Sequence, residues 1–484
     1  MLDFSGGQQG TANGSATVSE SIGSWGVNAS AQAMQSDGYI PVPASFRGAV
    51  DTPAGVRFGT GRLAIDRHYS NSNIFLAGDL FNESRTNGTV LQVNSTRLAE
   101  GSAGLDTLAV GGALSVRAYL SGQHYHQTFS SIADDRNSEQ LTRDQVVPAQ
   151  QFGLSAVWNR PLGANNTLAI GGDLRRVTGH SDELGFSAKG PTGTSNSGGR
   201  QLYLGGFLED MLRLGPRLHI TAAARVDAWR NYDALSTTQS IGKAAVTTPF
   251  ADRTNAALSP SLGAVFQVNH LVSLTGSAYG AFRSPTLNEL YRAFRVGNVL
   301  TLSNNALDAE RLRGAEAGVN IGNGPLFARA TYFWNTIHDA VGNRTISVTP
   351  SLITRQRQNL GDIVSRGVEL EVDARLPHGL WTRAAYEYSD SFISRSLESA
   401  LLNLRVPQVP RHAVSEAIGY DSRRWSGSLV GRYVGGQFED DVNQFLLPGY
   451  FTADAMLRVR LTSGIEPFVA CENLLDRQYA IGRT

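Results

Sequence analysis

The short segment SRGVELEVDAR, residues 365–375, alternates strictly between apolar and polar positions. One parity is apolar and the other is charged: Val368, Leu370, Val372 and Ala374 against Glu369, Glu371, Asp373 and Arg375. Successive side chains of a β-strand point to opposite faces, so the segment predicts a strand with one apolar and one charged face. Such a strand suits a half-buried sheet, and it also suits a wall between lipid and a wet interior.

The same alternation recurs along the whole chain, for example in LSVRAYLSGQ, HITAAARVDA, RAAYEYS and AMLRVRL. About 20 such segments of roughly ten residues can be read, and none has a convincing helical period. Repeated weak alternation of this kind is typical of a membrane barrel with apolar residues outside and polar residues inside. The fold predicted is therefore all-β, a large antiparallel transmembrane β-barrel of about 20–22 strands.

The connections between these segments alternate in length. Tight ones occur at 214–217, 269–271 and 322–325, whereas long stretches rich in Gly, Ser, Thr and Asn occur at 179–200, 230–256, 284–311 and 391–411. Short turns on one rim and long loops on the other are typical of outer-membrane barrels. No linker or break in composition divides the chain, so residues 1–484 are predicted to form one domain.

The composition of the chain argues against several classes of protein and of segment. The 484 residues carry a formal net charge of zero and contain two lysines, Lys189 and Lys243, so no basic surplus is available for nucleic acid. The single cysteine, Cys471, excludes an intrachain disulfide framework. No run of 18 apolar residues predicts a transmembrane helix, and the start, MLDFSGGQQG, does not resemble a signal peptide.

Five blocks in the second half of the chain carry a resemblance: AYGAFRSPTLNELY (278–291), NNALDAERLRGAEAGV (304–319), YFWNTIHDAV (332–341), NLGDIVSRGVELEV (359–372) and ENLLDRQYAIGR (472–483). In this order and spacing they resemble the C-terminal barrel of TonB-dependent outer-membrane receptors. SDGYIPVPASFRGAVDTPA (36–54) resembles an early barrel loop of the same family. The resemblance covers essentially the whole chain.

The resemblance implies a 22-stranded barrel, filled by an N-terminal plug, in the bacterial outer membrane. It implies TonB-energised uptake of a scarce solute such as an iron–siderophore complex or cobalamin, with outer-membrane lipid, the TonB–ExbB–ExbD system and a small-molecule ligand such as a metal chelate as partners. No cofactor, no nucleic acid and a monomeric state are expected. Measured against the family pattern, the chain is expected to be truncated at both ends, without plug, TonB box or final strand.

The candidate ligand path consists of a loop base and a set of lumen charges. The stretch FRSPTLNELY offers Arg283, Asn288, Glu289 and Tyr291, and the alternative is that this stretch only orders a loop over the barrel mouth. The lumen charges are expected either to guide a ligand or to hydrogen-bond the plug: Glu369, Glu371, Asp373, Arg383 and Glu387.

Histidines give little support for a metal or haem. His124 and His126 form an H-x-H pair that could hold a metal, but no third ligand is evident, so the pair is interpreted as two polar residues near a rim. Haem receptors of the family place a histidine after the FRSPTLNELY block, and none lies between Arg283 and Glu310. No metal site is therefore predicted, and haem is disfavoured.

An enzyme is not predicted, because no H-E-x-x-H, P-loop or G-x-S-x-G motif is present and no nucleophile–base pair can be nominated. The alternative to a receptor is a passive porin without a plug.

Three structural expectations follow. The apolar parity should face lipid (Val368, Leu370, Val372, Ala384, Tyr386, Leu457 and Val459) and the charged parity the lumen (Glu369, Glu371, Arg383, Glu387 and Arg458). Ligand contacts should come from the four long loops. The edges near 2–7 and 466–475 should leave an irregular or weakly bonded seam, although lipid favours closure of the barrel.

Overall fold

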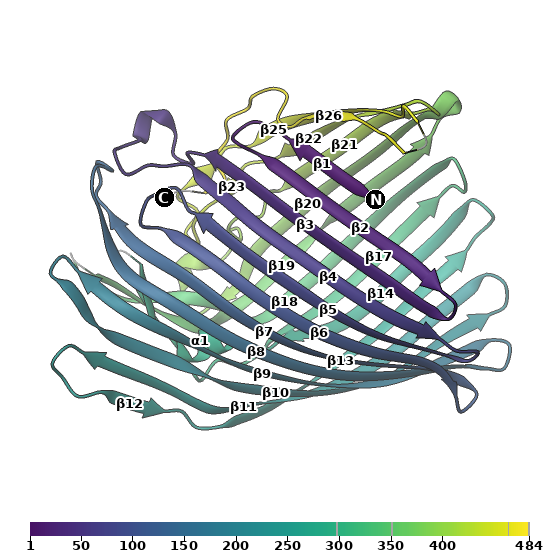
Figure 1. The fold of residues 1–484 in the computed structure, drawn as a ribbon. Coiled ribbons are helices and arrows are strands. Elements are labelled where there is room, and N and C mark those ends of the chain that lie inside the picture. The colour runs from purple at the N-terminus through teal and green to yellow at the C-terminus, as the bar shows by residue number, and fades with distance from the viewer. Residues whose placement is uncertain (297–298, 350–351, 463, 483–484) are drawn as a thin grey trace.

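A single strongly curved sheet makes up almost all of the computed structural model, which describes residues 1–296, 299–349, 352–462 and 464–482 (Figure 1). Over these ranges the sheet has 24 strands, of which β12, β15 and β16 are short strands in connections. The other 21 form the wall, each antiparallel to its neighbours. The predicted all-β antiparallel architecture and its strand number are confirmed.

The first half of the wall contains β1 (Leu2–Gly6), β2 (Ala12–Ile22), β3 (Trp25–Tyr39), β4 (Ala54–His68), β5 (Ser72–Thr86), β6 (Val93–Ala109), β7 (Gly112–Ile132), β8 (Glu139–Leu162), β9 (Asn166–Ser187), β10 (Gly190–Leu214) and β11 (Leu218–Ser240). The second half contains β13 (Arg253–Gln267), β14 (Val272–Arg283), β17 (Glu310–Ile321), β18 (Leu326–Thr349), β19 (Leu352–Arg375), β20 (Leu380–Ser396), β21 (His412–Asp421), β22 (Trp425–Val434), β25 (Tyr450–Val459) and β26 (Phe468–Cys471).

The remaining elements lie in connections: η1 (Ala44–Phe46), β12 (Val246–Pro249), α1 (Leu287–Tyr291), β15 (Phe294–Val296), β16 (Val299–Leu302), η2 (Pro377–Gly379), η3 (Ser399–Leu401), β23 (Gln437–Phe438) and β24 (Leu446–Leu447). Within the described ranges, every helix is too short to cross a membrane.

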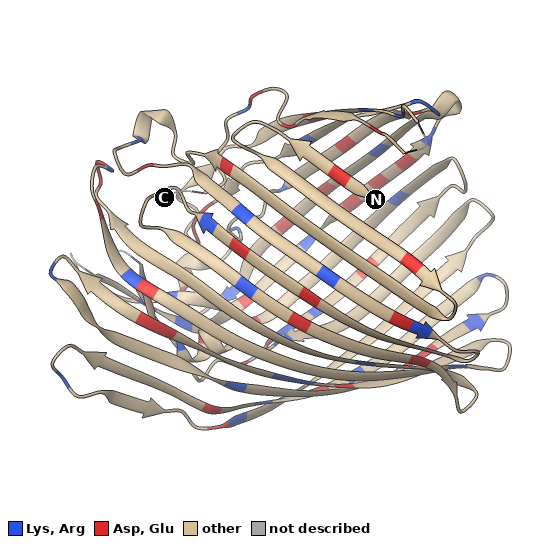
Figure 2. Cartoon of the chain, viewed as in Figure 1, with Lys and Arg blue, Asp and Glu red and all other residues tan. Residues whose placement is uncertain are grey.

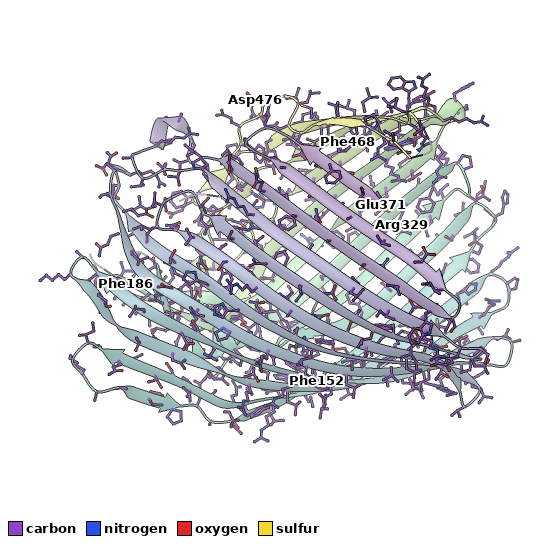
Figure 3. The ribbon with its side chains drawn as sticks, viewed as in Figure 1. Phe152, Phe186, Arg329, Glu371, Phe468 and Asp476 are labelled. Atoms are coloured by element: carbon purple, nitrogen blue, oxygen red, sulfur yellow. The ribbon has the colours of Figure 1, made fainter. Side chains whose placement is uncertain are left out.

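The strand registers assign each residue to one of the two faces, because residues directly opposite each other in an antiparallel pair share a face. Glu369 lies opposite Thr331 and Glu387, while Glu371 lies opposite Arg329 and Ala385. Figure 2 shows how such charges are spread along the strands, and Figure 3 labels Arg329 and Glu371, whose Nη1 and Oε2 atoms are 3.9 Å apart.

Following the registers round the sheet joins these charges to the face that encloses the lumen. The same face carries, on successive strands from β11 to β20, the residues His219, Val265, Thr275, Gly318, Thr331, Glu369 and Glu387. On β11 it also carries Asp227, Trp229 and Asn231. The helix α1, labelled in Figure 1, contacts β10 and β11. The predicted inward orientation of the charged parity is therefore confirmed, including Arg383 and Arg458.

The opposite face is apolar and exposed in the isolated chain. Its exposed aliphatic residues include Leu63, Leu76, Leu120, Leu154, Leu204, Val226, Leu258, Leu262, Leu274, Leu370, Ile418, Leu429 and Leu457. An apolar surface that continues over so many strands needs a partner, because soluble monomers rarely expose patches above a few hundred Å². In membrane β-barrels an outer apolar face of this kind contacts lipid.

The two rims differ as predicted. One rim carries short turns, such as 23–24, 110–111, 163–165, 215–217 and 322–325, and the other carries the long connections, such as 40–53, 241–252, 284–309, 397–411 and 435–449. The three tight turns predicted at 214–217, 269–271 and 322–325 all lie on the short rim.

The expectation of long structureless loops is wrong for much of their length. Residues 179–200 are mostly a hairpin, because β9 and β10 stay paired up to Ser187 and Gly190. Residues 230–256 include the end of β11 paired with β12, and 391–411 include the end of β20 and η3. Gly and Asn are depleted in strands, but ladder pairing with a neighbouring strand outweighs that preference here.

The sheet is not closed over the described residues. Its edges are β1 and β26, within the predicted 2–7 and 466–475, and no ladder joins them. The predicted seam is therefore present in the structure.

Candidate functional site

The connection between β14 and β17 folds back against the lumen face of the wall. Its first part is a short helix, α1, which begins after Thr286 with a capping box. The Thr286 backbone nitrogen donates to Oε2 of Glu289 at 2.8 Å, and the Thr286 hydroxyl oxygen accepts from the Glu289 backbone nitrogen at 3.2 Å. Arg283, the last residue of β14, donates to Glu289 at 3.0 Å and also pairs with Glu310 at the start of β17. The two ends of this connection, residues 284–309, are thus tied together.

The surroundings of Glu289 keep its carboxyl group ionised. Burial acts to raise the pKa of this carboxyl, but hydrogen bonds from Arg283 and from Thr286 outweigh burial and hold the pKa below its ordinary value of 4.5. Glu289 is therefore an ionised anchor of the helix rather than a proton donor.

An apolar cluster fixes α1 to the wall. Leu290 is 0%, Tyr291 2% and Leu307 1% exposed, and they pack with Ala234 of β11. The ring of Tyr291 lies 5.0 Å from the ring of Phe250, centroid to centroid. Complete burial of side chains of this size contributes about 1.5–3 kcal/mol each, so the cluster stabilises the attachment of α1 to the wall.

A polar cluster around Glu183 of β9 holds the segment after α1. Arg292 Nε donates to Oε1 of Glu183 at 2.5 Å, and Arg143 of β8 pairs with the same carboxylate. Ser181 and Gln145 donate to Oε1 at 3.0 and 3.2 Å. Glu183 is only 7% exposed, and a buried carboxylate is stable when its oxygens are satisfied in this way.

The far end of the connection lies against β19. The Arg357 Nη1 atom donates to the Asn288 carbonyl at 2.8 Å, and Asn304 Nδ2 donates to the Arg357 carbonyl at 2.9 Å. β16 pairs in parallel with β19. The connection therefore extends from β8 and β9 to β19, across the lumen side of the strands between them.

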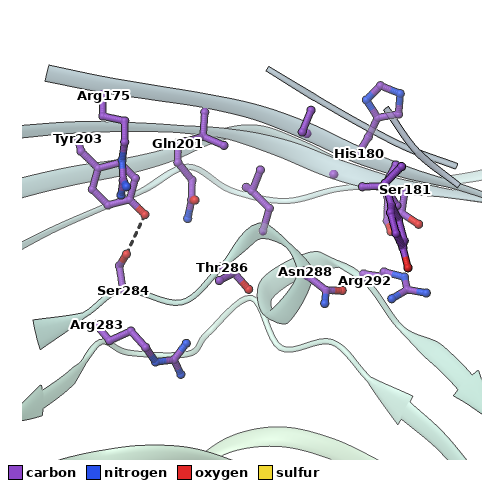
Figure 4. A pocket seen from close by; sticks show the side chains of 18 of the residues that line it. Arg175, His180, Ser181, Gln201, Tyr203, Arg283, Ser284, Thr286, Asn288 and Arg292 are labelled. Atoms are coloured by element: carbon purple, nitrogen blue, oxygen red, sulfur yellow. Dashed lines mark hydrogen bonds between the residues drawn. The ribbon is translucent and has the colours of Figure 1, made fainter. Parts of the chain in front are cut away.

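A cavity of about 950 Å³ lies between this connection and the lumen face of β7–β11 (Figure 4). Tyr203 of β10 links the two walls of the cavity, because its hydroxyl lies 2.7 Å from the Ser284 hydroxyl. Gln201 Nε2 donates to the Pro285 carbonyl and to Asn231 Oδ1, both at 2.9 Å. Arg175 of β9 places its guanidinium 4.3 Å from the centroid of the Tyr203 ring.

Charged groups at the cavity are mostly paired. Arg225 Nη2 lies 2.7 Å from Asp173 and 2.6 Å from Asp227. His180 also lines the cavity, although its register opposite Gly198 gives its side chain the outward parity of β9. The cavity thus combines aromatic and amide groups with guanidinium groups.

The four residues predicted at the loop base have separate roles. Arg283 and Asn288 line the cavity. Tyr291 is in the buried cluster and Glu289 caps α1, so these two side chains serve the structure of the segment, which was the alternative interpretation of this stretch.

The predicted lumen charges lie on β19 and β20, apart from the cavity. Arg383 Nε donates to Asp373 at 2.7 Å, and Glu369 faces Glu387 directly in the register. Like charges at directly opposite positions oppose pairing of the strands. A smaller cavity of about 370 Å³ lies nearby and is lined in part by Glu316 and Arg329.

Sequence reasoning missed the wall side of the cavity. Gln145, Arg175, Ser181, Glu183, Gln201 and Tyr203 were not nominated. On β9 the odd-numbered residues from Asp173 to Glu183 continue the inward parity, and this pattern could have identified Arg175 and Glu183. The abundance of Gly, Ser, Thr and Asn in residues 179–200 instead suggested that a loop begins at residue 179.

The H-x-H pair lies on the outer face of β7, where His126 Nε2 is 2.7 Å from Asp144 Oδ1. Over the described residues, no group of three or more His, Cys, Asp or Glu side chains is arranged to hold a metal ion.

Comparison with known proteins identifies relatives of this fold. Residues 26–474 match the family described as TonB dependent receptor-like, beta-barrel. The Ferrioxamine B receptor of Salmonella typhimurium is 30% identical over 189 residues, which are 36% of this chain and 25% of that receptor. The Ferrichrome outer membrane transporter/phage receptor of Escherichia coli K12 is 29% identical over 130 residues, 25% of this chain and 17% of that protein. These alignments span a quarter or less of the curated relatives.

Solved structures superpose on this fold over almost the full chain. The ferric yersiniabactin uptake receptor from Yersinia pestis superposes with a TM-score of 0.79 at 15% identity, covering 98% of this chain and 74% of that one. The copper transporter OprC gives a TM-score of 0.80 at 15% identity, covering 99% and 75%. At this identity the likeness shows the fold alone.

Proposed function

Because the chain belongs to the TonB-dependent receptor β-barrel family, we propose that it forms the barrel of a receptor that imports an iron(III)–siderophore complex across the bacterial outer membrane. The family consists of receptors and transporters rather than enzymes. The names of the curated relatives, a ferrioxamine B receptor and a ferrichrome transporter, support a hydroxamate-type chelate as the class of ligand.

The cavity between residues 284–309 and β7–β11 is the observation that carries this proposal. Its volume of about 950 Å³ suits a compact chelate, since small-molecule sites typically measure roughly 300–1,000 Å³. It combines apolar rings with a few positioned polar groups, and it lies towards the rim with the long connections. Sites of this composition bind small molecules by burial and select them by their polar groups.

The remaining parts of the proposal follow the family. The apolar outer face contacts outer-membrane lipid, and the barrel acts as a monomer. Since this chain covers 74% of the yersiniabactin receptor's chain, we assign the plug and the TonB contact to a further segment outside residues 1–484. Through that segment the TonB–ExbB–ExbD system supplies the energy, and the ligand contacts the cavity and the long connections. A passive porin is not favoured by family membership.

Uptake of radioactive iron tests the proposal. A strain lacking the gene is compared with the complemented strain under iron limitation, with ferrioxamine B or ferrichrome as the iron source. Complementation should restore uptake that saturates with chelate concentration and that stops when a protonophore is added or TonB is deleted. Uptake that rises linearly with chelate concentration and is unaffected by the protonophore would instead indicate a passive channel.

A further inference from the structure

Arg175 differs from the other arginines that line the cavity. Arg225 contacts two aspartates, Arg283 contacts two glutamates and Arg292 contacts Glu183. In the part of the chain that the structure describes, Arg175 has neither an ion pair nor a hydrogen bond. Its guanidinium instead lies over the face of Tyr203, 4.3 Å from the ring centroid.

The surroundings of Arg175 hold its side chain over the cavity. The register places Tyr119, Gly153, Arg175, Tyr203 and Trp229 in one row across β7–β11. A β-carbon at position 153 would lie 2.1 Å from the Tyr119 ring, so this ring covers the glycine beside Arg175. On the other side, the Tyr203 hydroxyl is engaged by Ser284, which fixes the ring beneath the guanidinium. The side chain of Arg175 is therefore flanked by the aromatic rings of Tyr119 and Tyr203.

Asp173 and Asp227, the acidic residues that line the cavity within the described ranges, are both paired with Arg225. Asp173, two positions before Arg175 on the same face of β9, lies against Arg225, whose side chain crosses Gly205 so closely that a β-carbon there would be 2.0 Å from Nη2. An arginine offers five donors in a rigid fork and stays charged, so Arg175 retains donors for a carboxylate or another oxyanion.

We propose that Arg175 binds a negatively charged group of the imported iron(III) chelate, so that the receptor selects chelates with an anionic arm over neutral or cationic ones. This inference rests on the proposed function and adds the charge of the ligand to it. Tyr203 carries the guanidinium, and its hydrogen bond to Ser284 connects the anion site to residues 284–309.

The test uses the protein produced from its native gene and purified in detergent, with binding followed by quenching of tryptophan fluorescence. The probes are iron(III) complexes that share one trihydroxamate core: ferrioxamine B, which carries a free ammonium group, its neutral N-acetyl derivative, and its N-succinyl derivative, which ends in a carboxylate. The wild-type protein should bind the N-succinyl complex most tightly and ferrioxamine B most weakly. This order needs no variant, so it is informative even if a substitution prevents folding.

Variants test whether Arg175 causes the preference for the N-succinyl complex. Arg175→Gln should weaken binding of the N-succinyl complex roughly 10- to 100-fold, as expected when a hydrogen-bonded charge pair is lost, and change the neutral complex by less than about threefold. Arg175→Lys should retain part of the preference. Arg62→Gln, which removes a lumen-facing arginine paired with Asp79 on β4 and β5, should leave all affinities unchanged.

Binding of the complexes without a preference for the N-succinyl form, or an equal loss for all of them in Arg175→Gln, would overturn the inference and leave the proposed function intact. Failure of every complex to bind would overturn both the hydroxamate ligand class and the inference.

Discussion

The Nε atom of Arg292 lies 2.5 Å from Oε1 of Glu183, although 109 positions separate the two residues in the chain. This contact fastens the connection 284–309 to β9 at a point where Arg143, Ser181 and Gln145 already hold the carboxylate in place. The segment that covers the cavity is thus positioned by a preformed acceptor on the wall.

Replacing Arg292 by Gln should loosen the connection. The ion pair is well buried, and hydrogen bonds to charged groups contribute about 1.5–3 kcal/mol each. Hydrogen exchange in peptides covering 284–296 and 299–309 should therefore become faster by roughly one to two orders of magnitude, while exchange in β2–β6 stays unchanged. Arg344→Gln is a suitable control, because Arg344 pairs with Glu398 at a more exposed position of the same rim. Equal acceleration in both variants would contradict a specific role for the Glu183 contact.

Acid should loosen the same connection through Glu289. The pKa of Glu289 is held below its ordinary value of 4.5 in the folded protein. A carboxyl with a lowered pKa contributes stability that is present above the ordinary pKa and is lost as the pH falls through the folded-state value. Exchange in 284–296, corrected for the intrinsic pH dependence, should accelerate as the pH falls below 4.5. Glu289→Gln should weaken this dependence, and an undiminished dependence in that variant would assign it to another group.

Tyr291→Ala should detach α1 from the wall. Removing a buried aromatic side chain typically costs about 3–5 kcal/mol, and the ring of Phe250 would lose its partner 5.0 Å away. We expect reduced chelate binding and faster exchange around 287–291, with the amount of folded barrel on a gel unchanged, because the wall does not depend on this cluster. Tyr291→Phe retains the ring and should behave like the wild-type protein. A large loss of folded barrel in the alanine variant would show that the cluster supports the wall itself.

The wall could be predicted from sequence and much of the site could not. Period-two alternation assigns Leu370 and Glu371 to opposite faces whatever the neighbouring strands are, so the orientation of β19 followed from local pattern alone. The hairpin of β9 and β10 was predicted as a loop, since its stability comes from pairing between strands, and composition does not report pairing.

The site depends on contacts between distant segments. Tyr291 looked like a ligand residue because the stretch that contains it resembles a loop base, but its position beside Ala234 and Leu307 buries it. Glu183 is one acidic residue among many until Arg292 and Arg143 are brought to it. Arg175 is informative because, among the described residues, it has no ion pair of the kind that the other cavity arginines have, and sequence alone does not show such pairing.

A charge on the outer face provides the sharpest test of the membrane orientation. Leu370 is on the apolar face and Glu369 is next to it on the lumen face. Arginine near the middle of the lipid face of a β-barrel costs about 2–4 kcal/mol, so Leu370→Arg should lower the free energy of unfolding in lipid vesicles by roughly that amount. Glu369→Arg should be tolerated, because the lumen is polar and the new side chain faces Glu387. Urea titrations of both variants in vesicles, followed by tryptophan fluorescence, measure the difference. If Glu369→Arg proved the more harmful of the two, the assignment of the faces would be wrong.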